Sequence, residues 1–268
     1  MKLTELPLIR FFSKKEKQQD DVCRCSSYSI QGRKESQEDD MLVWQDSRDV
    51  VVLVADGVGG HAHGEWASHH VVHDVFEKML NAVGVGNNPA VFLKETCYQA
   101  AKGVWQQGLY DAEYKDCGTT LTGFVYRKED GGLWVINIGD SRVYLVKAGG
   151  NKPVQLTNDQ VEESNSRQME FAIGQEPNYL YDHIEIYRMD DELKLQEGDV
   201  LMAVSDGVCE PFAAPRLDNP SIYTDNEVFR RFMQEIKFDE QSAKKIVDFA
   251  FESGSKDNIT CALMIRGK

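Results

Sequence analysis

Apolar positions along the chain follow two patterns, which predict short strands and amphipathic helices. The run VVLVA at residues 51–55 is uninterrupted, as in a strand buried on both faces. From Ala67 to Met79 apolar residues recur every four positions, which predicts a helix with one apolar face. A second helix is predicted from Pro89. Strands are predicted at residues 23–30, 40–44, 49–56, 118–126, 132–140, 142–146, 199–207 and 258–265, and later helices near 225–236 and 240–253.

The order of these segments predicts β-sheet layers with helices packed outside, not a regular alternation of strand and helix. The spacing of the strands at 118–126, 132–140 and 142–146 favours an antiparallel meander. Residues 1–21 end in the charged run SKKEKQQDD, which indicates a flexible N-terminal tail, and the alternative is a docking segment at LPLIRFF. One domain is therefore predicted over residues 22–268.

Composition narrows the function classes. With 44 acidic and 30 basic residues the net charge is −14, so a nucleic-acid backbone would be repelled. No apolar run approaches the ~20 residues of a membrane span, and LPLIRFF is too short for a signal core. The six scattered cysteines are typical of reduced, structural thiols. We therefore predict a cytoplasmic protein with no membrane span and no nucleic-acid partner.

Acidic residues stand at the ends of several predicted strands. Any one of them alone is also typical of a turn. Two carboxylates about 4 Å apart repel by roughly 1 kcal/mol in water and roughly 4 kcal/mol at an effective dielectric of 20, so a converging group would require cations. Oxygen ligands favour Mg²⁺ or Mn²⁺ over zinc. The residues of this predicted metal site are Glu38, Asp39, Asp56, Asp140, Asp206 and Asp257.

Two other motifs suggest different chemistry. GVGGHA at residues 57–62 fits the glycine pattern of a dinucleotide site, but another helix follows where that site needs a strand with an acidic tip. His61, His63, His69, His70 and His73 crowd one stretch, and His69 and His73 share a helix face. That pair could hold zinc, but no third ligand is evident in the sequence, so solvated histidines on a helix face are favoured.

An ordered set of motifs over residues 22–267 resembles the metal-dependent protein Ser/Thr phosphatases, called PPM or type 2C, in their compact bacterial branch. The motifs are SQEDD, VADGVGGHAHGEWAS, GTTLTGFV, INIGDSRVYLV, QLTNDQ, LMAVSDGV and KDNITCALM. The resemblance implies an α+β fold of two stacked antiparallel sheets with helix pairs on both outer faces. It also implies hydrolysis of phosphoserine and phosphothreonine on proteins by direct attack of a metal-bridging water.

The same resemblance implies roles for single residues. Asp56 would bridge two Mn²⁺ or Mg²⁺ ions, and the Gly57 carbonyl would bind one of them. Asp206 and Asp257 would complete the shell of the second ion, and Asn258 would support Asp257. Glu38 and Asp39 match the acidic pair of the family, and Asp140 with Asp206 would hold the third, looser ion of some members. The catalytic set is then Asp56, Asp206 and Asp257, with Arg33 on the substrate.

The sequence departs from the family pattern at two positions. Val58 stands where many eukaryotic members have a histidine proposed as the acid, which leaves the acid unassigned or leaves its role to water. Counting back from Glu38, the phosphate-binding arginine falls on Lys34, with Arg33 one step earlier. If this segment is extended, only one of the two faces the metals. We favour Arg33, because a guanidinium can bind two phosphate oxygens at once.

The leading hypothesis is thus a signalling phosphatase that acts on phosphoproteins made by a Ser/Thr kinase. An inactive relative that serves as a binding adaptor is the first alternative, although every matching acidic position is filled. A dinucleotide-binding oxidoreductase is the second.

Overall fold

The computed structural model describes residues 23–58, 63–81, 88–150, 152–162, 165–189, 194–215 and 223–267. The predicted N-terminal tail at residues 1–21 lies outside these ranges, and so does His61.

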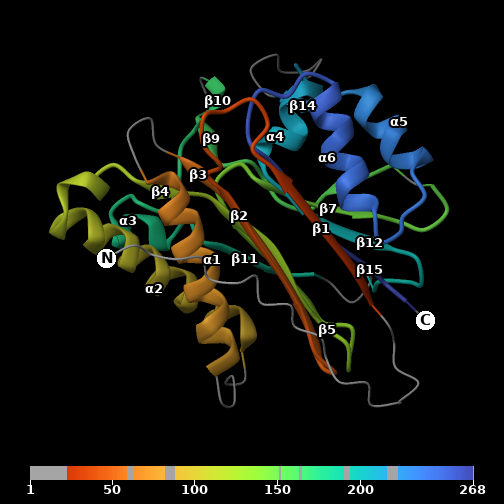
Figure 1. Cartoon of the computed structure of the whole chain (residues 1–268). Coiled ribbons are helices and arrows are strands. Elements are labelled where there is room, and N and C mark those ends of the chain that lie inside the picture. The colour runs from red at the N-terminus through yellow and green to blue at the C-terminus, as the bar shows by residue number, and fades with distance from the viewer. Residues whose placement is uncertain are drawn as a thin grey trace, which may run out of the picture.

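Two antiparallel sheets are stacked face to face, and a pair of helices covers the outer face of each sheet (Figure 1). The first sheet has the strand order β1 (Arg24–Ile30), β15 (Ile259–Ile265), β12 (Val200–Val204), β7 (Arg142–Val146) and β8 (Val154–Gln155). The second has the order β11 (Glu185–Arg188), β6 (Leu133–Ile138), β5 (Leu121–Arg127), β3 (Asp49–Val58) and β2 (Asp39–Gln45), with β4 (Gly118–Thr119) paired to the end of β3.

Helices α5 (Glu227–Glu235) and α6 (Ser242–Glu252) cover the first sheet, and α1 (Gly64–Asn81) and α2 (Pro89–Tyr110) cover the second. This arrangement confirms the predicted α+β sandwich. The shorter elements are η1 (Ala112–Tyr114), β9 (Val161–Glu162), β10 (Asn165–Met169), α3 (Pro177–Tyr181), α4 (Asp206–Cys209), η3 (Glu210–Phe212), β13 (Ala213–Pro215) and β14 (Tyr223–Asp225).

Strand β3 is buried on both faces, as its apolar run predicted. Its even-numbered residues from Val50 to Val54 lie in the core between the sheets. Its odd-numbered residues from Val51 to Ala55 lie in the core beneath α1 and α2. Because side chains alternate along a strand, one run of valines serves two cores.

Strand β2 alternates in the same way and separates two adjacent acids. Met41 and Val43 pack toward the core between the sheets, whereas Leu42 and Trp44 pack toward the helices. By the same alternation Asp39 faces the space between the sheets and its neighbour Asp40 faces α1.

The predicted meander is wrong at its third strand. Strands β5 and β6 pair as expected, but β7 pairs with β12 and β8 in the other sheet. The chain changes sheet at Gly139, whose φ of 104° lies in the left-handed region. All five residues of β7 are buried, which suits its place between β12 and β8 in the first sheet. The neighbour of β6 is instead β11, which the sequence did not predict.

The helices begin close to their predicted positions. Asn88 caps α2, since its side-chain oxygen accepts hydrogen bonds from the backbone N–H groups of Ala90 and Val91, and Pro89 follows it at the first turn. None of the described helices has both the length and the apolar character that a membrane span requires. All six cysteines are free, and five of them are buried.

Candidate active site

The strand register brings the predicted acids to one end of the stacked sheets. Asp39 at the start of β2 lies opposite Asp56 near the end of β3. Asp206 follows β12 and Asp257 precedes β15, and these two strands pair antiparallel with Val204 opposite Cys261. Asp206 and Asp257 therefore lie at the same end of the first sheet.

Asp56 is at the centre of this group. Burial raises the pKa of Asp56 well above its usual range, and the charges of Asp39, Asp206, Asp140 and Asp257 raise it further. The carboxyl groups thus come from both sheets and lie close enough to repel one another.

The neighbouring carboxyl groups are perturbed in the same direction. Burial raises the pKa of Asp39 to about 7, although hydrogen bonds from Thr260 and Ser205 oppose the rise. Burial also raises the pKa of Asp140 to about 7, with a further contribution from Asp206. For Asp206 itself, burial and then repulsion from Asp257 raise the pKa to about 6. Each carboxyl group is held where its charge is unfavourable without a counterion.

Two carboxylate oxygens in this group have no hydrogen-bond partner. Oδ1 of Asp39 and Oδ1 of Asp206 are buried and unpaired within the described part of the chain. Such oxygens are costly unless something binds them. A set of oxygen donors with unpaired lone pairs fits a hard divalent cation such as Mg²⁺ or Mn²⁺.

The backbone of Asp56 is held by two threonines of the GTTLT motif. Its N–H donates to Oγ1 of Thr120 at 2.9 Å. Its carbonyl accepts from the Thr120 N–H and from Oγ1 of Thr119, both at 2.9 Å. The main chain is fixed on both sides, which leaves the carboxylate available to a ligand.

Gly57 allows the first turn of α1 to lie against the end of β3. A Cβ atom at this position would be 2.5 Å from the carbonyl of Gly64 and 2.6 Å from the carbonyl of Glu38. Any side chain here would therefore displace the start of α1 from the acids.

Asn258 connects the segment before β2 to the acidic group. Its Oδ1 accepts from the Glu38 N–H at 2.9 Å, and its Nδ2 donates to the carbonyls of Gln31 and Ser36, both at 2.8 Å. Its own N–H donates to Oδ1 of Asp257 at 2.8 Å. One buried amide thereby fixes the positions of Glu38 and Asp257 relative to each other.

Lys34 is the basic residue that the structure places beside the acids. Its Nζ lies 2.9 Å from Oδ1 of Asp257. Burial lowers the pKa of Lys34, but the hydrogen bond and charge of Asp257 outweigh that effect and the pKa is raised overall. Asp56 and Glu38 act in the same direction. The ammonium group thus stands at the rim of the carboxylate group.

Arg33 points to a different part of the molecule. Its guanidinium donates to the carbonyls of Ser255 and Phe251 and lies 4.5 Å from the centre of the Phe251 ring. The backbone from Gly32 to Ser36 turns instead of running extended, so the strand alternation assumed for this segment does not apply. The geometry does not support our preference for Arg33.

Ser205 is a site residue that the sequence analysis did not single out. Its hydroxyl donates to Oδ2 of Asp39 at 2.8 Å and accepts from the Thr260 N–H at 3.0 Å. The signal was its place directly before Asp206, at the end of a buried strand. Val58, at the position of the missing histidine, is half-buried.

The described histidines of the crowded stretch lie in different surroundings. His63 stacks on Tyr114 with ring centres 4.2 Å apart, and His70 stacks on Trp66 at 4.9 Å. His69 and His73 face Asp40 and are considered below. Within the described residues, none of these four histidines forms a hydrogen bond with Asp56 or Asp206.

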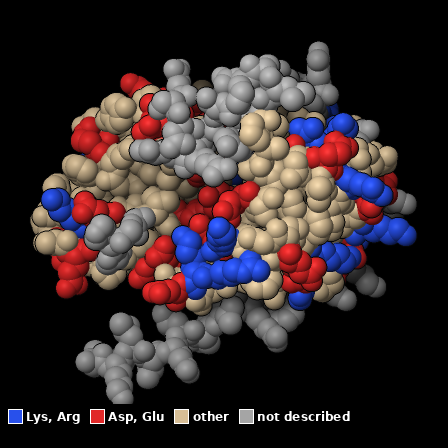
Figure 2. Space-filling model, turned by 90° about the horizontal axis from the view of Figure 1, so that it is seen from above, with Lys and Arg blue, Asp and Glu red and all other residues tan. Residues whose placement is uncertain are grey.

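Acidic side chains gather in the middle of the face seen in Figure 2, and basic side chains lie next to them. This distribution matches a cation site with a positively charged rim. A comparison with family models identifies the type of protein: the model described as protein phosphatase 2C matches residues 28–249. The chain belongs to the protein phosphatase 2C family.

Bacterial proteins are among the relatives of this chain. It is 26% identical over 244 residues to a putative protein phosphatase 2C-type of Streptococcus pyogenes, covering 87% of this chain and 93% of that protein. It is 25% identical over 231 residues to the serine/threonine protein phosphatase PstP of Mycobacterium tuberculosis, covering 78% of this chain. The chain matches only 39% of the length of that mycobacterial relative.

The fold agrees with solved structures of the same family. The catalytic domain of PstP, crystallised in complex with two manganese ions, superposes with a TM-score of 0.70 at 23% identity, covering 92% of this chain and 99% of that one. The oxidoreductase hypothesis finds no support, because α1 leads to α2 and every pairing between the described named strands is antiparallel.

Proposed function

We propose that this protein phosphatase 2C family member is a metal-dependent phosphatase that hydrolyses phosphoserine and phosphothreonine on proteins. The observation that carries the proposal is the group of buried carboxyl groups around Asp56. Asp39 and Asp206 each have an unpaired buried oxygen there, and the pKa values of all three carboxyl groups are raised. An inactive adaptor would have no need to keep such mutually repelling groups together.

The residues divide into those that hold cations and those that position them. Asp56, Asp206 and Asp257 would hold two Mn²⁺ or Mg²⁺ ions. Glu38, Asp39 and the Gly57 carbonyl extend this set, and Asp140 with Asp206 offers a third position. When bound, the ions supply a nucleophilic water at neutral pH and neutralise charge on the phosphate oxygens.

Lys34 is assigned to the substrate. A phosphate monoester that approaches the acids needs a positive group to offset their repulsion. Lys34 offers one at 2.9 Å from Asp257, whereas the guanidinium of Arg33 is occupied by backbone carbonyls near the end of α6. We therefore assign phosphate binding to Lys34 in place of Arg33. Val58 cannot donate a proton, so the acid that protonates the leaving alcohol stays unassigned between another group and water.

The wider assignments follow from this activity. The substrates are proteins phosphorylated by a Ser/Thr kinase, so the chain acts in signalling. Its six free cysteines suit a reducing compartment, and we place it in the cytoplasm. Residues 22–268 form the phosphatase domain.

The proposal is tested with a phosphothreonine peptide and a phosphoserine peptide. Release of phosphate is measured after removal of bound metal, and then with Mn²⁺, Mg²⁺ or Zn²⁺ added back. Activity that requires Mn²⁺ or Mg²⁺ supports the proposal. Full turnover after thorough chelation, or turnover restored by Zn²⁺ alone, contradicts it. A chain that binds Mn²⁺ but never releases phosphate is the adaptor.

A further inference from the structure

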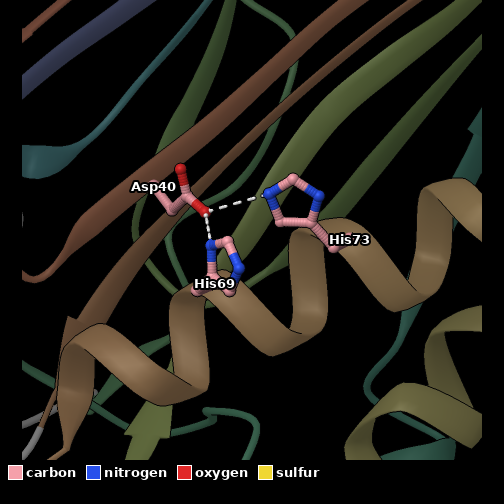
Figure 3. Close-up of side chains that lie close together, drawn as sticks. All are labelled: Asp40, His69 and His73. Atoms are coloured by element: carbon pink, nitrogen blue, oxygen red, sulfur yellow. Dashed lines mark hydrogen bonds and ion pairs between the residues drawn. The ribbon is translucent and has the colours of Figure 1, made fainter. Parts of the chain in front are cut away.

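A second group of metal-ligand side chains lies on the helix side of β2. Asp40 projects from β2 toward two histidines on successive turns of α1 (Figure 3). Nδ1 of His69 is 2.9 Å from Oδ2 of Asp40, and Nε2 of His73 is 3.5 Å from the same oxygen. The three donor atoms lie within 4.8 Å of one another. The structure thus supplies the third ligand that the sequence did not reveal.

We propose that Asp40, His69 and His73 bind a divalent transition-metal ion, with Zn²⁺ as the best match. Two imidazoles and one carboxylate are typical ligands of zinc, whereas Mg²⁺ and Mn²⁺ favour oxygen donors alone. A tetrahedral zinc ion at 2.0–2.1 Å from each ligand holds its donor atoms about 3.3 Å apart. The two distances from Oδ2 of Asp40, 2.9 Å and 3.5 Å, lie on either side of that value, so small side-chain rotations suffice.

The site is accessible and its ligands are held by rigid elements. The side chains of His69 and His73 are 66% and 46% exposed, and that of Asp40 is 26% exposed. An ion can therefore enter from solvent, and water can take the fourth position. Oδ1 of Asp40 accepts the Met41 N–H at 2.8 Å, which turns Oδ2 toward the histidines.

This site is separate from the acidic group. Asp39 and Asp40 are adjacent, but the alternation of β2 directs them to opposite faces of the sheet. Asp39 accepts from Ser205 between the sheets, and Asp40 faces α1. An ion on Asp40 would bridge β2 to α1, the helix whose Ser68 hydroxyl donates to the Glu38 carbonyl at 2.6 Å. Its role is to fasten the helix to the strand that carries the acids, and it does not depend on the proposed phosphatase activity.

The experiment measures Zn²⁺ binding to the full chain by calorimetry at fixed pH, in saturating Mg²⁺ so that the acidic group is occupied. The His69→Gln/His73→Gln double variant removes two donors from exposed positions. His70→Gln is the matched control, since it removes a histidine from the same helix but none of the three donors. Circular dichroism checks that each variant is folded.

The wild-type chain should bind one more Zn²⁺ than the double variant, and its Tm should rise with Zn²⁺ concentration. In the double variant the affinity for Zn²⁺ at this site should fall steeply. Loss of a hydrogen-bond partner of a ligand alone costs about 10–100-fold, and loss of the ligands themselves should cost more. Asp40→Asn should weaken it too, whereas His70→Gln and Asp56→Asn should keep it. Equal stoichiometry and affinity in the wild type and the double variant would overturn the proposal. So would the absence of any Zn²⁺-dependent rise in Tm.

Discussion

At the scale of single residues, Asp56 is the carboxyl group at the centre of the candidate site. It is buried, and four other carboxyl groups raise its pKa after burial has done so. Its main chain is fixed by Thr119 and Thr120, so its backbone cannot shift to relieve the repulsion. This combination indicates a residue placed for a cation and not for stability of the metal-free fold.

Asp56→Asn and Asp206→Asn should each reduce kcat/KM on a phosphothreonine peptide by more than about 100-fold, because each removes a charged ligand. In a chelator the same variants should have a higher Tm than the wild type, since one member of a repelling group becomes neutral. Asp182→Asn, an exposed aspartate on the surface, is the control and should change neither value. Near-normal turnover in Asp56→Asn would rule out its role as a bridging ligand.

Lys34 and Arg33 are adjacent, and their contacts predict opposite behaviour. Lys34→Ala should raise KM by about 10-fold or more, given the roughly 1.5–3 kcal/mol that a hydrogen bond to a charged group contributes. Arg33→Ala should leave KM unchanged, because its guanidinium contacts Phe251 and Ser255. Both variants are measured on one phosphopeptide at saturating Mn²⁺. A rise in KM confined to Arg33→Ala would restore our first preference.

At the scale of elements, the loop before β2 depends on the side chain of Asn258, the residue just before β15. Asn258 makes three side-chain hydrogen bonds to backbone groups of residues 31–38. Asn258→Ala removes the hydrogen-bond partner of these groups, which costs about 1–3 kcal/mol for each group that water cannot reach.

Asn258→Ala should therefore lower the Tm and weaken Mn²⁺ binding by about 10–100-fold, as expected for a residue that orients ligands. Thermal unfolding and Mn²⁺ titration of activity measure the two effects. Asn178→Ala serves as control, because Asn178 is exposed and lies in α3. If Mn²⁺ affinity stayed at the wild-type value while the Tm fell, Asn258 would be structural only.

The element scale also shows how far the sequence could predict the molecule. The uninterrupted apolar run of β3 and the four-residue spacing in α1 identified their elements directly, because burial on a strand or helix requires those patterns. The acids were identified because each lies at the end of a predicted strand. The partner of β7 was not predictable, because which sheet a buried strand joins is decided by long-range pairing. Asp40 meets His69 and His73 only once α1 packs on β2.

At the scale of the whole molecule, repulsion within the acidic group destabilises the fold when no cation is bound. The chain carries a net charge of −14, so the acids receive little compensation from the surface. Burial raises the pKa of Asp39 and of Asp140 to about 7 and the pKa of Asp206 to about 6, which brings these three groups near neutral pH. By contrast, the hydrogen bond from Arg127 lowers the pKa of Asp130, on the surface, to about 2.

These directions set the sign of the pH dependence. A carboxyl group has a pKa near 4 in the unfolded chain, so between about pH 4 and pH 7 the metal-free native state binds more protons than the unfolded state. The free energy of unfolding therefore decreases as pH rises through this window. Groups like Asp130, with lowered pKa, reverse the trend only below about pH 4.

We expect urea unfolding in a chelator to show stability that decreases from pH 5 to pH 8. With saturating Mn²⁺ or Mg²⁺ the decrease should vanish or reverse, because the ions bind the deprotonated carboxylates and their affinity grows with pH. Asp206→Asn should flatten the slope seen in chelator, since it removes one of the titrating groups. Stability of the metal-free wild type that increased steadily from pH 5 to pH 8 would contradict the raised pKa values. In that case the fold would hold the acids apart, and they would not form a shared cation site.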